Sequence, residues 1–488
     1  HGRKSKPKIH PLPGSRAECA AARSSSPPPR SRPHLLSPLA AVCKRLTTMD
    51  DGEDDLISGL HDDLLCKIIS RLPLKDAART DALASRWRHL WRCVPLVLSD
   101  EHLSEPTRAA SVSRILADHP GPFDSVILHH NRFVPLSPEL SEWPRLLAAK
   151  GVQRLAFVNQ KPAGAQAHAP YLCLPADILR CGASLERLFL ACWTLPDPVF
   201  RSLVAFPRLR TLGMVNITMT DQYLDSLLAA SPVLEILLLS CPINRFHLRS
   251  QSIRSVLAFP MEEFVVVEAP LLERLIFLKR LPNVRADPVM VKISSPSKLR
   301  VLGYMEPMIH RLHINGNIIK HDTMPSPSTV IPGLKILALK VNFCVFGEVK
   351  MVPSLLRCFP NVFTLHLESG LCETATGEHH GQFWQGVGPV ECLRLHVKSM
   401  VFHNFQGHQN EFEFLKFVAR YAKVLNSLLL VPPKGKVLSG DEVTQMIDKL
   451  GCPWFRAWTS KVLLVSPEEN HWSPMTACMV TGVNDPFC

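Results

Sequence analysis

The chain has 488 residues, of which 46% are hydrophobic and 20% are charged, and this composition is typical of a globular protein with a large buried core. The net charge of +12 does not indicate a folded nucleic-acid-binding face, because residues 1–48 hold ten Lys or Arg and a single acid, Glu18. The near-neutral remainder predicts no nucleic-acid partner, and no apolar run approaches the roughly eighteen residues of a transmembrane helix, which predicts no membrane partner.

The cysteine pattern and the absence of catalytic motifs argue against an enzyme or a metalloprotein. The fifteen cysteines never form a C-x-x-C pair, so we expect no structural zinc. Their scattered positions and odd number favour a reduced compartment over a disulfide scaffold, and we predict the nucleus or the cytoplasm. The sequence contains no phosphate-binding loop, no H-E-x-x-H and no G-x-S-x-G. We therefore predict a non-enzymatic protein with no catalytic residue, no metal and no cofactor.

Residues 1–54 are predicted to be a disordered leader, basic up to residue 48 and acidic in "DDGEDD". The segment is rich in Pro, Ser and Arg, and the first methionine of the chain is Met49. An Arg- and Ser-rich, acid-poor leader also fits a transit peptide, and residues 1–48 equally fit an untranslated leader. We exclude the segment from the predicted fold.

Residues 55–98 predict three short helices. Leucines and isoleucines recur at helical spacing from Leu60 to Leu72, and Pro73 ends this first helix. A second helix is expected from about Lys75, and "SRWRHLW" predicts a third with Trp87 on its apolar side. About forty residues are too few to close a core alone, so either the rest of the chain or a partner must cover the apolar surface.

The stretches "LPLKDAART" and "RWRHLW" resemble the plant form of the F-box motif. The resemblance implies a docking surface for a Skp-type adaptor, which links F-box proteins to a cullin and a ubiquitin-conjugating enzyme. His61 stands where the motif normally has proline, and "ALASRW" replaces the usual "VLSRRW" at Ala84 and Ser85, which leaves open whether adaptor binding is weakened. The residues that the resemblance implies for adaptor binding are Leu60, Asp62, Leu64, Leu65, Ile68, Leu72, Pro73, Leu74, Ala78 and Trp87.

A recurring apolar-x-x-apolar-x-apolar frame follows, and it predicts a leucine-rich-repeat solenoid over residues 105–388. Most intervals between frames fit the repeat length of about 20–29 residues, and four intervals suggest insertions. Proline precedes five frames by two residues, where it separates a loop from a strand. The expected fold is α/β: a small three-helix F-box followed by an irregular solenoid with a curved parallel sheet. The frames begin at Phe123, Val152, Leu185, Leu209, Leu234, Leu272, Leu299, Leu334, Val362, Val390 and Leu425.

Residues 389–432 resemble the FBD region of plant F-box proteins and are expected to complete the solenoid with a strand, a Gly-containing loop, a helix and a strand. Phe414, Phe417 and Val418 follow helical spacing, which favours core packing over a recognition surface. Residues 433–488 are assigned to a C-terminal extension.

The inner face of the predicted sheet is the expected docking surface for a target protein, because the residues that flank the last apolar position of each frame point away from the core. Early strands offer small and apolar side chains there, and late strands offer charged residues and histidines. The candidate target-binding residues are Phe189, Lys340, His366, Glu368, Arg394 and His396.

These features favour a substrate-recognition subunit of a Skp–cullin–F-box ubiquitin ligase that binds an unknown target protein. Two alternatives stay open. The first is an F-box receptor that senses a small molecule at the solenoid, and the second is a scaffold that binds a protein without ubiquitin transfer.

Overall fold

The computed structural model describes residues 57, 59–160, 170–195, 205–259, 261–278, 288–294, 298–371, 380–433, 462–464 and 473–479. The chain divides into two compact units, His1–Leu60 and His61–Cys488, and the fold below is that of the second unit. The predicted leader, residues 1–54, lies outside the described residues.

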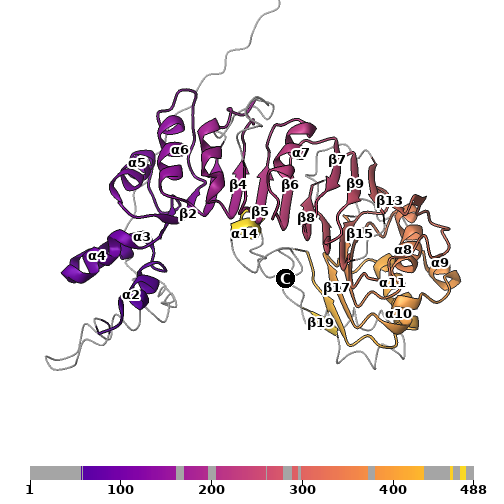
Figure 1. Ribbon diagram of the computed structural model, residues 1–488. Helices are drawn as coiled ribbons and strands as arrows, with labels where there is room; N and C mark the ends of the chain where they lie inside the picture. The colour runs from indigo at the N-terminus through magenta and orange to yellow at the C-terminus, as the bar shows by residue number, and fades with distance from the viewer. Residues whose placement is uncertain are drawn as a thin grey trace, which may run out of the picture. The chain divides into compact units, whose positions relative to one another are not determined.

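A parallel sheet of fourteen strands is the centre of the unit (Figure 1). Each strand pairs with the strands of the preceding and following repeats, so the sheet order follows the chain order, as in a solenoid. The strands are β1 (Leu96–Ser99), β2 (Phe123–Leu128), β3 (Arg154–Val158), β4 (Arg187–Ala191), β5 (Thr211–Val215), β6 (Ile236–Ser240), β8 (Ser255–Ala258), β10 (Arg274–Phe277), β12 (Val301–Met305), β15 (Ile336–Val341), β16 (Thr364–Ser369), β17 (Ser399–His403), β18 (Ser427–Leu430) and β19 (Val462–Leu464).

The segments that return from one strand to the next change from helix to strand and back to helix. Early returns contain α5 (Arg108–Asp118), α6 (Glu139–Ala149), the 3-10 helix η2 (Ala176–Ala183) and α7 (Asp221–Ala229). Middle returns form a second sheet of β7 (Arg245–Arg249), β9 (Glu263–Glu268), β11 (Val289–Ile293), β13 (His310–Ile314) and β14 (Asn317–Ile318). Late returns contain α8 (Phe346–Cys358), α9 (Gly381–Gly386), α10 (Glu391–Leu395) and α11 (Gln409–Tyr421).

The periodicity of burial explains this change. In β7, "RFHLR" alternates strictly between exposed and buried side chains, whereas α7 buries Leu224 and Leu227 at helical spacing. In the middle repeats the outer layer is therefore a second sheet in place of helices.

Ten of the eleven predicted frames coincide with strands of the main sheet. The frame at Val390 does not: Glu391–Leu395 is the helix α10, and the strand of this repeat is β17, Ser399–His403. The long interval between the frames at Leu234 and Leu272 is not an insertion, because β8 supplies a further repeat there. The sheet also begins earlier than the predicted solenoid, at β1.

Aromatic side chains fill the space between the sheet and its outer layer. Phe157 of β3 stacks on Trp193 with ring centroids 5.0 Å apart, and Trp193 Nε1 donates a hydrogen bond to the carbonyl of Phe157 at 3.0 Å. In the FBD region Phe414 and Phe417 are buried, which confirms that this helical stripe is core. The strand, Gly-containing loop, helix and strand predicted for this region are β17, the loop with Gly407, α11 and β18.

Three helices precede the sheet: α2 (Asp62–Ile69), α3 (Leu74–Arg79) with the 3-10 turn η1 (Thr80–Ala82), and α4 (Ser85–Cys93). We call residues 61–93 the N-terminal helical unit. Its last helix packs on the first repeat, where the ring of Trp91 lies 5.0 Å from that of His119. A Cβ on Gly121 would lie 2.6 Å from the carbonyl oxygen of Arg92, so only glycine fits at this contact.

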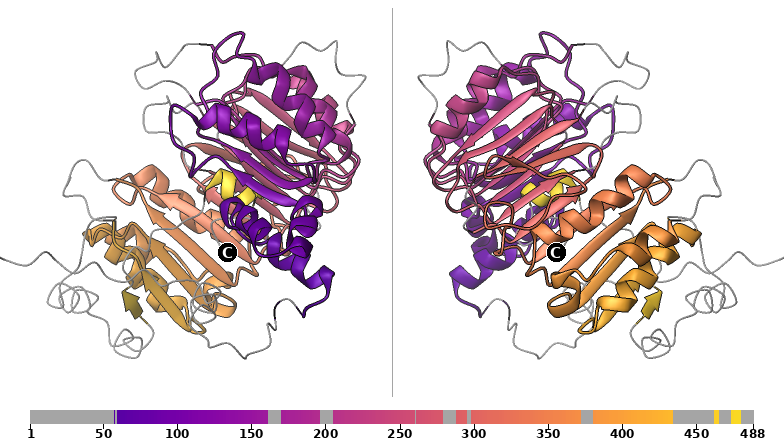
Figure 2. Two further views of the ribbon diagram at one scale, coloured as in Figure 1. Left: turned by 90° about the vertical axis from the view of Figure 1, so that its left-hand side faces the viewer. Right: turned by 90° about the vertical axis from the view of Figure 1, so that its right-hand side faces the viewer.

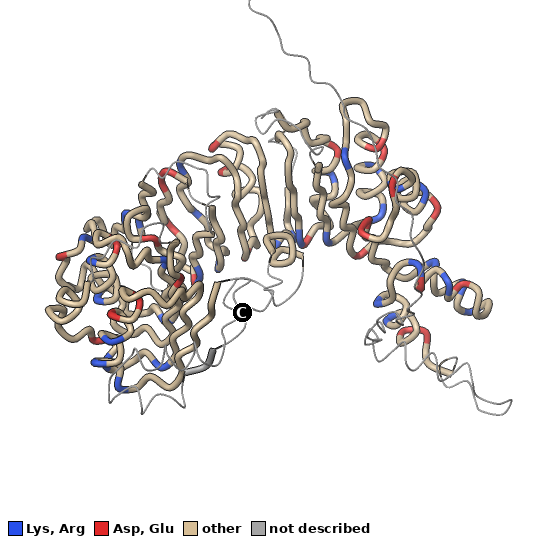
Figure 3. The backbone as a smooth tube through the Cα atoms, turned by 180° about the vertical axis from the view of Figure 1, so that it is seen from behind, with Lys and Arg blue, Asp and Glu red and all other residues tan. Residues whose placement is uncertain are grey.

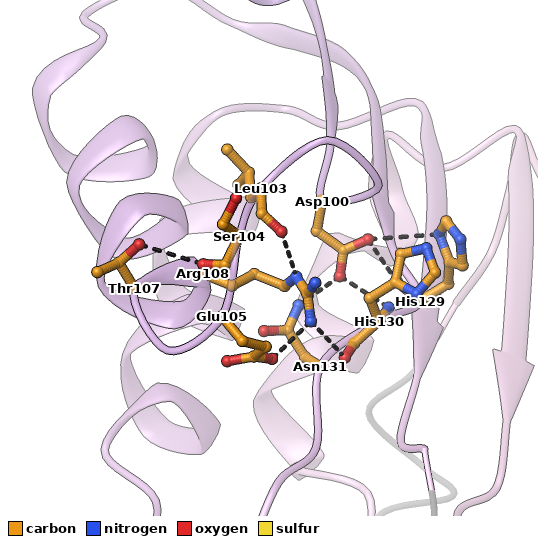
Figure 4. A network of polar contacts seen from close by, with 9 residues as sticks. All are labelled: Asp100, Leu103, Ser104, Glu105, Thr107, Arg108, His129, His130 and Asn131. Carbon is orange, nitrogen blue, oxygen red and sulfur yellow. Dashed lines mark hydrogen bonds and ion pairs between the residues drawn. The ribbon is translucent and has the colours of Figure 1, made fainter. Parts of the chain in front are cut away.

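A buried carboxylate joins the first two strands where they end (Figure 4). Asp100, directly after β1, accepts hydrogen bonds from the backbone N–H groups of His129 and His130 at 3.1 and 2.9 Å, and from Asn131 Nδ2 at 2.5 Å. Arg108 of α5 donates to the carbonyl of His130 at 3.1 Å. Because β1 follows α4 almost directly, this network ties the N-terminal helical unit to the solenoid.

Candidate functional site

The N-terminal helical unit divides its apolar residues between an interior and a surface. Leu65, Ile69, Ala77, Trp87 and Leu90 are buried between its own helices and against the adjoining chain. Of the residues implied for adaptor binding, Leu65 is 0% exposed and Trp87 is 5% exposed, so these two shape the unit and present no surface in this structure.

A surface of apolar residues remains on the same helices. Leu64 is 47% exposed, and Leu83, which the sequence did not single out, is 65% exposed. Pro73 and Ala78 are also exposed, while Ile68, Leu72 and Leu74 are half-buried. We call Leu64, Ile68, Leu72, Pro73, Leu74, Ala78 and Leu83 the helical-unit surface. Leu60, half-buried, belongs to the other compact unit.

The caps of these helices show what the two departures from the F-box pattern do. His61 is the N-cap of α2 with φ −62°, a value that proline also adopts, and its Nδ1 accepts from the N–H of Asp63 at 3.5 Å. Ala84 is the N-cap of α4, and its methyl group makes no capping hydrogen bond. Since N-cap positions favour Ser, Thr, Asp and Asn, α4 begins without the side-chain acceptor that the motif's usual serine offers.

An ion pair links the first and third helices. Arg86 of α4 reaches Asp62 in the first turn of α2, with Nη2 2.6 Å and Nε 2.7 Å from Oδ1. Asp62 therefore lies at the exposed edge of the unit with a partner in its own chain. An exposed pair of this kind contributes little to stability, about 0–1 kcal/mol.

The late strands bring three of the candidate target-binding residues, Lys340, His366 and Glu368, together on one face of the sheet. Lys340 of β15, Glu368 of β16 and His403 of β17 occupy the same register across neighbouring strands. Lys340 Nζ lies 2.9 Å from Glu306 Oε2, so Glu306 extends the row towards the middle of the sheet. His366 lies one side-chain position earlier on the same face of β16 as Glu368.

Glu306 and His403 are the members of this row that sequence reasoning missed. The alternation in "SMVFH" was the signal for β17, and it places His403 on the inner face with Ser399 and Val401. Because the frame at Val390 assigned the strand of this repeat to residues that form α10, β17 and His403 were not predicted.

Arg394 and His396 do not belong to this row. Both were predicted on a strand, but Arg394 lies in α10 and His396 is its C-cap. The apolar residues Val390, Leu393 and Val397 are buried at intervals of three and four residues, which is helical spacing. Arg394 is exposed, and neither residue is part of the strand row.

Phe189 is also not available as a surface residue. It is 4% exposed, because the helix α14 (Pro474–Met479), from the predicted C-terminal extension, contacts β3 to β6 on the side of the sheet opposite α5, α6 and α7 (Figures 1 and 2).

The described residues offer no grouping of three or more His, Cys, Asp or Glu suited to a metal ion. Within the same residues, no helix combines the length and apolar character needed to cross a membrane. Acidic and basic residues are interspersed along the described chain (Figure 3). Cys344 is disulfide-bonded, which departs from the expectation of free thiols, whereas nine other described cysteines, including Cys66, Cys181 and Cys478, are free.

Comparison with known proteins identifies the repeats and the region that follows them. The family model for the LRR repeats of FBD-associated F-box protein At5g56370 matches residues 140–367, and the FBD family model matches residues 385–430. This chain carries the leucine-rich repeats and the FBD region of an FBD-associated F-box protein.

The names of similar proteins from Arabidopsis thaliana combine the F-box with an FBD, with leucine-rich repeats or with both. FBD-associated F-box protein At5g60610 is 23% identical over 404 residues, which cover 76% of this chain and 98% of that protein. F-box/FBD/LRR-repeat protein At1g51370 is 26% identical over 416 residues, covering 78% and 89%. F-box/LRR-repeat protein 13 is 30% identical over 221 residues, covering 43% and 47%. The likeness to the first two extends over most of this chain.

Proposed function

We propose that this chain is the substrate-recognition subunit of a Skp–cullin–F-box ubiquitin ligase in the nucleus or the cytoplasm. In this proposal the helical-unit surface binds the Skp-type adaptor, and the inner face of the solenoid binds a target protein. The observation that carries the proposal is the continued exposure of Leu64, Pro73, Ala78 and Leu83 on helices whose interior is already filled.

The energetics favour a partner for this surface. Burial of a large apolar side chain stabilises a complex by about 1.5–3 kcal/mol, and an exposed cluster of such side chains typically marks an interaction site. The unit has its own small interior around Leu65 and Trp87, so docking does not require those residues to leave it.

The chain supplies no catalytic residue in this proposal. Its contribution to ubiquitin transfer is to hold the target close to the ligase machinery, which raises the effective concentration of the target lysines.

Co-purification of the full chain with a Skp-type adaptor tests the proposal. We expect the double variant Leu64→Asp, Leu83→Asp to lose adaptor capture by at least about tenfold, because it places two charges on the apolar surface. The matched control is Leu136→Asp, at a leucine that is 98% exposed in the loop before α6. Full adaptor capture by the double variant, with the fold intact by circular dichroism, would contradict the proposal.

Target turnover separates a ligase subunit from a scaffold. We expect a captured target to accumulate when the proteasome is inhibited and to be spared when the double variant replaces the wild-type chain. Unchanged turnover in both conditions, with adaptor binding intact, would instead favour a scaffold.

A further inference from the structure

The inner face of the sheet carries a row of uncharged residues in exact register from β3 to β10. Ala156 pairs with Phe189, Phe189 with Gly213, and Gly213 with Leu238. The row continues to Leu257 and Ile276. Residues on the inner face of a solenoid point away from its core, yet the side chains of this row are almost completely buried. A segment from elsewhere must therefore cover at least part of them.

Part of this cover is the helix α14. It contacts β3, β4, β5 and β6, and its Cys478 and Met479 form one buried cluster with Phe189 and Leu238. Cys478 is completely buried. Arg187 Nη1 of β4 donates a hydrogen bond to the carbonyl oxygen of Cys478 at 3.2 Å, close to the C-terminal end of the helix, where a positive charge is favoured.

The position of α14 on the sheet depends on Gly213, a glycine in the row. A Cβ on Gly213 would overlap the sulfur of Cys478 and would lie 2.6 Å from Cδ2 of Phe189. Any other residue at position 213 would fill the space that Cys478 occupies. Two segments far apart in the sequence thus have complementary shapes, which indicates a formed binding site rather than a loose contact.

The contact is small enough to be exchangeable. The helix is six residues long, and its buried residues are Ala477, Cys478 and Met479. Only one of these three, Met479, is a large side chain, so little apolar surface holds the helix on the sheet. Elements with few buried contacts open at a lower free energy than the strands beneath them.

We propose that the inner row over β3–β6 is a docking site for a short, uncharged helical segment of a target protein, and that α14 is a built-in occupant which such a segment displaces. This inference rests on the proposed function, since it names where and what the solenoid binds. Because α14 is part of the same chain, it competes with a target as an intramolecular ligand. Only a target that binds better than α14 therefore gains access to the site.

The experiment measures binding of a fluorescein-labelled, end-blocked peptide of residues 473–479 to the full chain by fluorescence anisotropy. In Cys478→Arg the new guanidinium would be buried beside Arg187, so we expect α14 to leave the site. Thr476→Arg is the matched control, because Thr476 is only partly buried on the same helix. We expect the peptide to bind Cys478→Arg at least about tenfold more tightly than it binds the wild type or the control.

Met479→Arg is a second variant designed to release α14 from the site, and it is used if Cys478→Arg does not fold. Equal peptide binding to the wild type and to a folded variant would overturn the inference. So would a lack of peptide binding to both Cys478→Arg and Met479→Arg, provided that hydrogen exchange shows β5 and β6 to be protected and the variants therefore folded. Adaptor capture is measured on the same proteins. If the wild-type chain captured no adaptor, the proposed function would be overturned and the peptide result would stand. If the peptide bound the wild type and the variants equally, only the inference would be overturned.

Discussion

His366 of β16 and His403 of β17 face each other across neighbouring strands, with ring centroids 6.0 Å apart and ring planes within 9° of parallel. Burial, with a smaller contribution from His403, lowers the pKa of His366 to about 4. Glu368 pairs in register with His403 and lies beside it in the same row. His403 therefore belongs to the row of Lys340 and Glu368, and His366 lies one side-chain position earlier on the same face.

The first prediction is a loss of stability at acidic pH that depends on His366. Between pH 6.5, the usual histidine pKa, and about 4, the unfolded chain binds a proton at this residue and the folded chain does not. As far as His366 is concerned, the folded state is most stable above pH 6.5 and loses stability as the pH falls towards 4. Urea unfolding at pH 5 and 7.5 should show a smaller pH effect for His366→Gln, by about 1–3 kcal/mol at most.

His89→Gln is the control for this measurement, because His89 is exposed on α4. Burial also lowers the pKa values of His119, His129 and His313. The variant His366→Gln therefore keeps part of the wild-type pH dependence, with the same sign. Identical pH dependence in His366→Gln and wild type would contradict the assignment.

The second prediction concerns the uncapped start of α4. Ala84→Ser should raise the free energy of unfolding by about 1 kcal/mol, because serine at an N-cap accepts a hydrogen bond from the first turn. Thermal and urea unfolding measure the gain. Ala82→Ser is the control, since Ala82 ends η1 and caps nothing. A gain in the control equal to that of Ala84→Ser would show that capping is not its cause.

The third prediction separates two adjacent leucines of α2. Leu65→Ala should destabilise the chain by about 2–5 kcal/mol, because Leu65 is buried and its removal leaves a cavity. Leu64→Ala should cost less than about 1 kcal/mol, because nearly half of Leu64 is exposed, and should instead weaken adaptor capture. If both variants unfolded at the same urea concentration, the division between interior and surface would be wrong.

The fourth prediction concerns the carboxylate at the junction with the solenoid. Asp100→Ala removes the acceptor of three N–H donors in a buried site and should cost about 2–5 kcal/mol. Asp118→Ala, at an exposed position of α5, should change stability by about 0.5 kcal/mol or less. Hydrogen exchange at His129 and His130 should increase in Asp100→Ala alone, and unchanged exchange there would argue against the network.

The sequence by itself determined the repeats and the helical unit. Both follow local patterns: ten frames became strands because alternating apolar residues must face one core, and Pro73 ends the first helical stretch because proline cannot continue a helix. The frame at Val390 failed because a run of six residues fits both a helix and a strand. The frame that begins at Ile253 contains β8 and was not predicted; it lies nineteen residues from the neighbouring frames on each side, which is shorter than the usual repeat length.

Only the tertiary structure decided which apolar residues are available for binding. Leu64 and Leu65 are neighbours with the same side chain, and their opposite burial depends on where α4 packs. The row from Ala156 to Ile276 exists only because strands from separate repeats align in register. The helix α14, which covers the part of the row over β3–β6, lies more than two hundred residues later in the sequence. Burial is a property of contacts between distant segments, and no local pattern in "SPMTACM" specifies its seat at Gly213.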